Sequence, residues 1–136
     1  PVLPSSEPSC SPHNKHPVGG KMSYLQLAGL SGALAIGLGA FGAHGLKGKV
    51  PDTSIKTWET ASQYHLAHSV ALLAVSLGQK SLSATAAKYA PPLLLGGTVL
   101  FSGSLYVLVL TGIKPIGAIT PIGGFTLIGG WLALMR

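Results

Sequence analysis

Four long apolar stretches fill most of this sequence of 136 residues and limit what it can fold into. A helix needs about 20 mostly apolar residues to cross a hydrocarbon core roughly 30 Å thick, and its backbone must satisfy its own hydrogen bonds there. The stretches that reach this length are residues 23–43, 57–78, 90–112 and 116–135. They predict an all-α protein, an integral membrane four-helix bundle, with residues 23–136 as one transmembrane domain.

The second stretch is the weakest of the four. Its apolar part, residues 66–77, is too short to span a bilayer alone. It reaches full length only with the amphipathic turns that carry Glu59, His65 and His68. Polar side chains are therefore concentrated in this helix.

Composition leaves little material for a catalytic site. Only 9% of the residues are charged and 47% are hydrophobic, as is typical of integral membrane proteins. We therefore expect a protein that is not an enzyme. The net charge of +6 comes largely from lysines that flank apolar spans. Such lysines act as orientation and headgroup signals, so membrane subunits and lipids are the expected partners and nucleic acid is not.

Residues 1–22 form a polar N-terminal extension that is rich in Pro, Ser, His and Gly. It has too few apolar residues to fold alone, so we expect contact with a partner surface or with lipid headgroups to order it. Its single Cys10 supports no internal disulfide and no thiolate metal cage. The chain begins at Pro1 and not at methionine. We therefore expect an upstream segment that is removed or not included here.

Gly and Pro predict where the helices end. Breaks are expected in residues 45–56, 79–88 and 112–115. Pro91 and Pro92 suit the first turn of the third helix, where a missing N–H does no harm. Pro121 predicts a kink inside the fourth helix, and Trp131 near its end is expected to anchor at the membrane interface.

Small residues recur every fourth position in the first span. One stripe contains Gly29, Ala33 and Gly37, and a second contains residues 35, 39 and 43. Such stripes let helix backbones approach closely. The first helix is therefore expected to make close contacts with other helices.

Three histidines are the candidate site residues, namely His44, His65 and His68. They have three interpretations: hydrogen bonds to carbonyls at a helix end, binding of a metal, haem or pigment, or handling of protons and ions. A spacing of three places His65 and His68 about 60° apart on one helical face. However, a nearby carboxylate or thiolate is lacking except for Glu59, nearly two turns from His65. The structural interpretation is favoured, with the three histidines clustered near one membrane face. No catalytic residue, metal site or cofactor is predicted.

Several motifs together resemble a known family. They are Phe-Gly-Ala-His-Gly-Leu at 41–46, Trp-Glu-Thr-Ala-Ser-Gln-Tyr-His-Leu-Ala-His at 58–68, Phe-Ser-Gly-Ser-Leu-Tyr at 101–106 and Thr-Pro-Ile-Gly-Gly-Phe at 120–125. In this order, over residues 23–136, the chain resembles the transmembrane protein 256 family. The resemblance implies a small four-helix membrane protein of unknown function, with eukaryotic members associated with mitochondria. It implies no enzymatic activity.

These observations predict a non-enzymatic accessory subunit of a larger membrane assembly. The expected setting is the mitochondrial inner membrane and a respiratory complex or supercomplex, with a thylakoid or bacterial inner membrane as the alternative. One rival is a small transporter or channel whose pathway uses the three histidines with Gln63 and Tyr64. Another is a membrane protein that binds haem, pigment or metal through the histidines.

Overall fold

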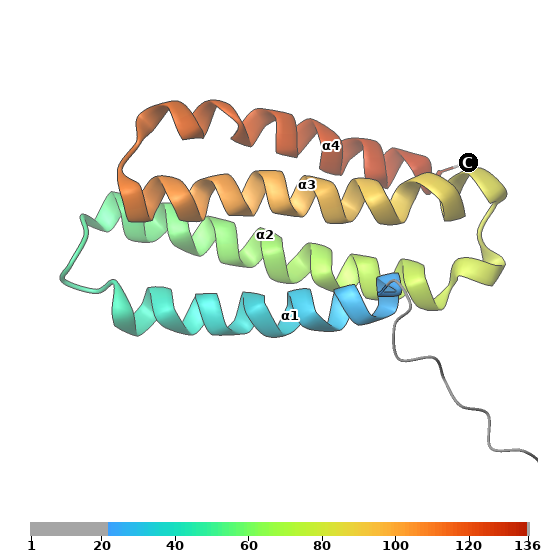
Figure 1. Cartoon of the computed structure of the whole chain (residues 1–136), viewed down its shortest axis with the longest axis horizontal. Helices are drawn as coiled ribbons and strands as arrows, with labels where there is room; N and C mark the ends of the chain where they lie inside the picture. Colours follow the sequence, from blue (N-terminus) through green and yellow to red (C-terminus); the bar gives the residue numbers. More distant parts are fainter. Residues whose placement is uncertain (1–21, 136) are drawn as a thin grey trace, which may run out of the picture.

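The computed structural model describes residues 22–135, and this part of the chain is entirely helical in its regular structure (Figure 1). Four α-helices are joined by short connections: α1 (Tyr24–Ala40), α2 (Asp52–Leu77), α3 (Ala84–Thr111) and α4 (Thr120–Ala133). A π-helical turn, η1 (Phe41–Gly45), extends α1, and two 3₁₀ turns, η2 (Gln79–Ser81) and η3 (Lys114–Ala118), precede α3 and α4. The predicted all-α, four-helix architecture is confirmed. The predicted extension, apart from Met22, and Cys10 with it lie outside the described residues.

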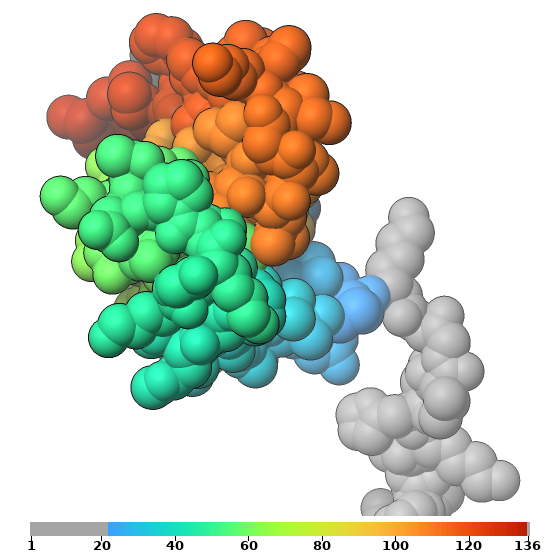
Figure 2. Space-filling model, turned by 90° about the vertical axis from the view of Figure 1, so that its left-hand side faces the viewer, coloured from blue at the N-terminus to red at the C-terminus, as the bar shows by residue number. Residues whose placement is uncertain are grey.

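The helices form an open row in chain order. The extensive contacts are those of α1 with α2, α2 with α3, and α3 with α4. Figure 1 shows α1 and α4 at opposite edges of this row. Figure 2 views the end that carries the η1 turn and the α3–α4 connection, with α1 and α2 (teal to green) below α3 and α4 (orange). Most buried side chains belong to α2 and α3, so the core lies in the middle of the row.

Three helical stretches are long and apolar enough to cross a membrane. They are Tyr24–Gly45, Ala84–Thr111 and Lys114–Ala133. Within residues 22–135, α2 is not one of them, in agreement with its place as the weakest of the four predicted spans. The reason is chemical, because the first half of α2 carries Asp52, Lys56 and Glu59. In the uncharged remainder of the helix, Gln63, His65 and His68 lower the hydropathy. This helix lies between α1 and α3, which cover its sides.

The third helix begins earlier than the prolines predicted. Ser83 caps it by accepting a hydrogen bond from the backbone N–H of Ala86 at 3.2 Å, so α3 starts at Ala84. Pro91 and Pro92 therefore lie two turns inside the helix, and the expectation that they form its first turn is wrong. Counting only apolar residues missed the two turns that the serine cap starts.

Pro121 also differs from its prediction. It lies in the first turn of α4, which begins at Thr120, because the preceding apolar residues form the 3₁₀ turn η3. A proline at this position removes no helical hydrogen bond. The expected kink inside the fourth helix is therefore replaced by a change from 3₁₀ to α-helix.

Glycine lets α4 pack closely on α3. A Cβ added to Gly123 would lie 2.4 Å from the backbone N of Phe101. A Cβ added to Gly97 would lie 2.8 Å from the backbone N of Leu127, and one added to Gly130 would lie 3.2 Å from the backbone N of Leu94. The α3–α4 pair is thus joined by backbone approach at glycine.

We predict that Gly123→Ala lowers the stability of the folded protein by about 1 to 3 kcal/mol, because the new methyl group overlaps rigid backbone of α3. The matched control is Gly124→Ala, whose added Cβ meets only the Phe101 ring at an ordinary 3.8 Å. Denaturant unfolding in mild detergent, followed by circular dichroism, measures both. Equal stability of the two variants would contradict the close packing of α4 on α3.

Candidate functional site

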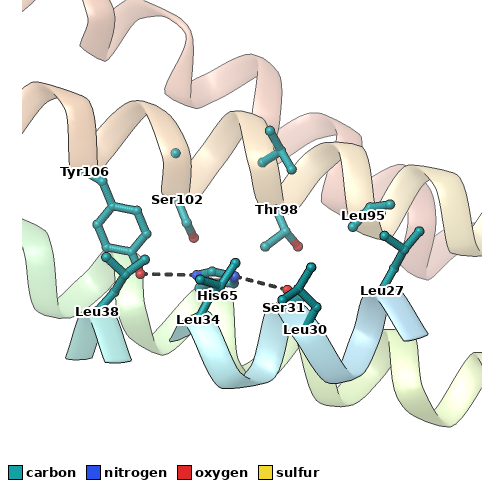
Figure 3. A pocket seen from close by; sticks show the side chains of 12 residues that line it. Leu27, Leu30, Ser31, Leu34, Leu38, His65, Leu95, Thr98, Ser102 and Tyr106 are labelled. Carbon is teal, nitrogen blue, oxygen red and sulfur yellow. Dashed lines mark hydrogen bonds between the residues drawn. The ribbon is translucent and has the colours of Figure 1, made fainter. Parts of the chain in front are cut away.

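A pocket of about 270 Å³ lies between α1, α2 and α3 (Figure 3). Its walls are mostly aliphatic, and its polar residues come from all three helices. The lining residues are Leu27, Leu30, Ser31, Leu34, Leu38, His65, Leu95, Thr98, Val99, Ser102, Gly103 and Tyr106. Several of them, including Leu30, Leu34 and Val99, are exposed on the surface of the row. The pocket therefore opens toward the lipid-facing side between α1 and α3.

A chain of hydrogen bonds crosses the pocket and joins the three helices. His65 of α2 is at its centre, with Nε2 3.0 Å from Ser31 Oγ of α1 and Nδ1 3.4 Å from the Tyr106 hydroxyl of α3 (Figure 3). Ser31 Oγ also lies 2.6 Å from Ser69 Oγ, and the Ser69 hydroxyl donates to the His65 carbonyl at 2.8 Å. The polar groups in this part of the molecule are thus paired with one another.

The chain has one direction in which every donor hydrogen is used. Since the Ser69 hydroxyl donates to a carbonyl, its oxygen accepts the hydrogen of Ser31. The Ser31 oxygen then accepts from His65, which places the histidine proton on Nε2. His65 Nδ1 is left as an acceptor for the Tyr106 hydroxyl. The network therefore assigns His65 as the neutral Nε2 tautomer.

Helical spacing explains why these side chains meet. His65 and Ser69 are four residues apart and lie on the same side of α2. Opposite them, α1 offers Gly32, and a Cβ placed there would meet the Ser69 side chain at 3.9 Å. A Cβ would therefore still fit at Gly32, and the two helices lie close enough for the neighbouring Ser31 to reach His65.

Trp58 holds Tyr106 in place at the closed end of the pocket. Its ring is 1% exposed and lies 4.6 Å from the Tyr106 ring, centroid to centroid. The Trp58 indole N–H donates to the Leu38 carbonyl at 2.7 Å. An added Cβ at Gly42 would lie 2.2 Å from Trp58, so only glycine fits at this position of η1. The Phe-Gly-Ala-His-Gly motif thus admits the indole beside the end of α1.

His68 belongs to a different contact. Its Nε2 accepts from the Trp131 indole of α4 at 3.2 Å, so its proton is on Nδ1, which donates to the Tyr64 carbonyl at 2.8 Å. His68 therefore makes the expected hydrogen bond to a carbonyl, but in mid-helix and not at a helix end. Trp131 was expected to be an interfacial anchor, but its N–H is directed to this histidine.

His44 is exposed in η1 and is joined to neither of the other two histidines. It lies 13 residues along the helix from Ser31, which is about 20 Å at the usual helical rise. The predicted cluster of three histidines is wrong, because a 60° separation on α2 is enough to direct His65 and His68 to different neighbours. In residues 22–135 no three His, Cys, Asp or Glu side chains are grouped to hold a metal ion.

The pathway suggested for a transporter is also divided. Gln63 is exposed, and the Tyr64 ring packs 4.6 Å from Phe101 of α3 and 5.8 Å from His68. These residues therefore lie away from the pocket that His65 lines.

Sequence reasoning missed Ser31, Ser69 and Tyr106, which complete the chain around His65. The available signal was the presence of hydroxyl side chains inside otherwise apolar spans, where each needs a partner. Their pairing across three helices was not readable from spacing along any one of them.

The helical row with its apolar exterior defines a multi-pass membrane protein. The chain belongs to the family described as "Protein of unknown function (DUF423)", whose model matches residues 38–124.

Two bacterial membrane proteins are among the relatives of this chain. The chain is 44% identical over 113 residues to "UPF0382 membrane protein YwdK" of Bacillus subtilis, a match that covers 82% of this chain and 92% of the relative. It is 45% identical over 114 residues to "UPF0382 membrane protein SAB0533" of Staphylococcus aureus, covering 82% and 91%. No solved structure matches the chain. The family is one of small membrane proteins of unknown function, in agreement with that part of the resemblance.

We predict that His65→Ala lowers the free energy of unfolding by about 1 to 3 kcal/mol, because it leaves the hydroxyls of Ser31 and Tyr106 without their partner. His44→Ala is the matched control, since the ring of His44 is exposed and its loss is expected to change stability by less than about 0.5 kcal/mol. Denaturant unfolding in detergent compares the two. A larger loss for His44→Ala would contradict the assignment of His65 as the central histidine.

Proposed function

We propose that this chain is a non-enzymatic accessory subunit that packs against a larger membrane assembly through the outward face of α1. The observation that carries the proposal is the stripe formed by Gly29, Ala33 and Gly37, all of which are exposed. In a membrane, where apolar surface gains little by leaving lipid, helices associate through close packing at such small residues.

The glycines on the two sides of α1 differ in whether another helix lies beside them. Gly32 and Gly39 face α2, where an added Cβ would meet Ser69 and Ser62 at 3.9 and 3.8 Å. A Cβ at Gly29 or Gly37 would meet nothing within 4 Å. One small-residue face of α1 is thus used inside the described fold, and the other is open to a further helix. The position of α1 at an edge of the row leaves room for that helix (Figure 1).

The non-enzymatic character is supported by how the polar side chains are used. His65 and His68 each spend both ring nitrogens on hydrogen bonds within the fold. The hydroxyls of Ser69 and Ser102 donate to backbone carbonyls of α2. The bonds of His65, His68 and Ser102 that leave their own helix join α2 to its neighbours, which is the role expected in a structural subunit.

The membrane in question is proposed from the relatives and from the resemblance, which differ. The named relatives are bacterial membrane proteins, and they favour a bacterial inner membrane over the mitochondrial one. A mitochondrial respiratory complex as the partner rests on the resemblance alone. The proposed partner is therefore defined by its surface, an apolar transmembrane helix that fits closely against Gly29, Ala33 and Gly37.

We predict that Gly37→Leu leaves the chain folded and inserted but releases it from its assembly. The new side chain has space on the isolated chain and fills the groove that a partner helix would occupy. Native electrophoresis of gently solubilised membranes measures co-migration with the larger complex. The matched control is Gly96→Leu on α3, where an added Cβ also meets nothing within 4 Å.

Two results would contradict the proposal. One is unchanged co-migration of Gly37→Leu, and the other is an unsubstituted chain that migrates alone under conditions that preserve other membrane complexes. If Gly96→Leu alone caused release, the contact would lie on α3 and not on α1.

A further inference from the structure

The pocket between α1 and α3 has a mostly apolar wall with a small polar patch, and that patch decides which ligand group can bind there. Five of its lining residues carry groups that can donate a hydrogen bond: Ser31, His65, Thr98, Ser102 and Tyr106. We infer that the pocket binds a neutral, hydroxyl-bearing lipid, an alcohol or phenol on an apolar skeleton, whose O–H donates to the oxygens of this lining.

All five hydrogen-bond donors of the lining are already used in hydrogen bonds within the fold. The hydroxyl of Ser102 donates to the Ala61 carbonyl at 2.8 Å, and that of Thr98 donates to the Leu94 carbonyl at 2.7 Å. In the chain described above, Tyr106 donates to His65, and His65 donates to Ser31. The fifth hydrogen, that of Ser31, is given to Ser69. What these oxygens still offer is lone pairs, of which only a small part is exposed at the mostly apolar pocket surface.

The direction of the hydrogen-bond chain decides which ligand group the pocket accepts. A ligand carbonyl needs a donor, and Tyr106 can supply one without leaving His65 Nδ1 unpaired only if His65 and Ser31 both reverse their hydrogen bonds. In that reversed state Ser69 gives its hydrogen to Ser31, and the His65 carbonyl loses the hydroxyl that it now accepts. A ligand hydroxyl needs no such change and adds one hydrogen bond to a complete network. The pocket therefore favours a hydroxyl over a carbonyl.

The charge of the lining and the depth of the pocket in the membrane limit the ligand to a weakly polar molecule. The described residues that line the pocket include no carboxylate, so an ammonium donor would find no counter-ion there. Lining residues 27–38 of α1 and 95–106 of α3 fall in the middle parts of two membrane-spanning stretches. A phospholipid keeps its charged headgroup at the interface, so the ligand at this depth is a weakly polar molecule dissolved in the hydrocarbon core.

The volume of the pocket and its opening toward lipid admit a ligand with an apolar skeleton. A volume of about 270 Å³ exceeds the roughly 150 Å³ that accepts a benzene ring in an engineered protein cavity. The leucines of α1 and Leu95 and Val99 of α3 supply apolar walls for the skeleton. Exposed Leu34 and Val99 lie at the rim, where a longer tail would continue into lipid.

The experiment uses the full chain in lipid nanodiscs and three photoreactive probes with the same long alkyl tail. One ends in a primary alcohol, one in its methyl ether and one in a methyl ketone. Crosslinked peptides are identified by mass spectrometry. We expect the alcohol to label residues 27–38 and 95–106 about fivefold more than the ether or the ketone, the factor that one hydrogen bond of about 1 kcal/mol supplies.

Two variants test the site itself. Gly103→Leu fills the pocket from α3, where an added Cβ meets nothing within 4 Å, and should abolish labelling of the pocket by all three probes. Gly96→Leu, which is not part of the lining, is its control. Equal labelling by alcohol and ether, stronger labelling by the ketone, or undiminished labelling of Gly103→Leu would each overturn the inference.

Discussion

The contact between Trp58 and the end of α1 is the interaction on which the rest of the structure depends. The indole of Trp58 is nearly completely buried, and its N–H donates to the Leu38 carbonyl at 2.7 Å. The same ring packs against Phe41 in η1 and against Tyr106 in α3, with centroids 5.6 and 4.6 Å apart. One side chain of α2 thereby positions both of its neighbouring helices. The position of Tyr106 brings its hydroxyl within hydrogen-bond distance of His65 Nδ1. Trp58 therefore determines the geometry of the pocket at the end that Tyr106 lines.

Pairing of polar groups is the second constraint, because an unpaired polar atom is costly in a lipid environment. In the described part of the chain every buried side-chain nitrogen and oxygen has a hydrogen-bond partner. The Ser102 hydroxyl of α3 donates to the Ala61 carbonyl of α2. Ser104 Oγ of α3 is hydrogen-bonded to Thr120 Oγ1 of α4 at 2.7 Å. These bonds connect successive helices of the row. They fix rotation and register at places where small residues and aliphatic surfaces alone would allow sliding.

The sequence predicted the helices better than it predicted the site. Apolar length and Gly or Pro breaks were sufficient for four helices and their connections. They were not sufficient for the start of α3, because Ser83 caps two turns that precede the apolar run, nor for the 3₁₀ turn before Thr120. The predicted cluster of histidines was wrong for a different reason. Spacing along α2 gives the angle between His65 and His68, but the neighbour that each ring meets is decided by the packing of α1, α3 and α4.

The polarity of α2 has a consequence for how the protein is made. A helix that begins with Asp52, Lys56 and Glu59 gains little from entering lipid alone, whereas α1 and α3 gain much. We therefore expect α2 to remain at the insertion machinery, or at the bilayer surface, until α3 has been synthesised and both flanking helices can shelter it. Biogenesis would then proceed in two stages, with α1 committed first and the other three helices entering together. A chain that ends shortly after Leu77 and has been released from the ribosome would have only one helix stably integrated.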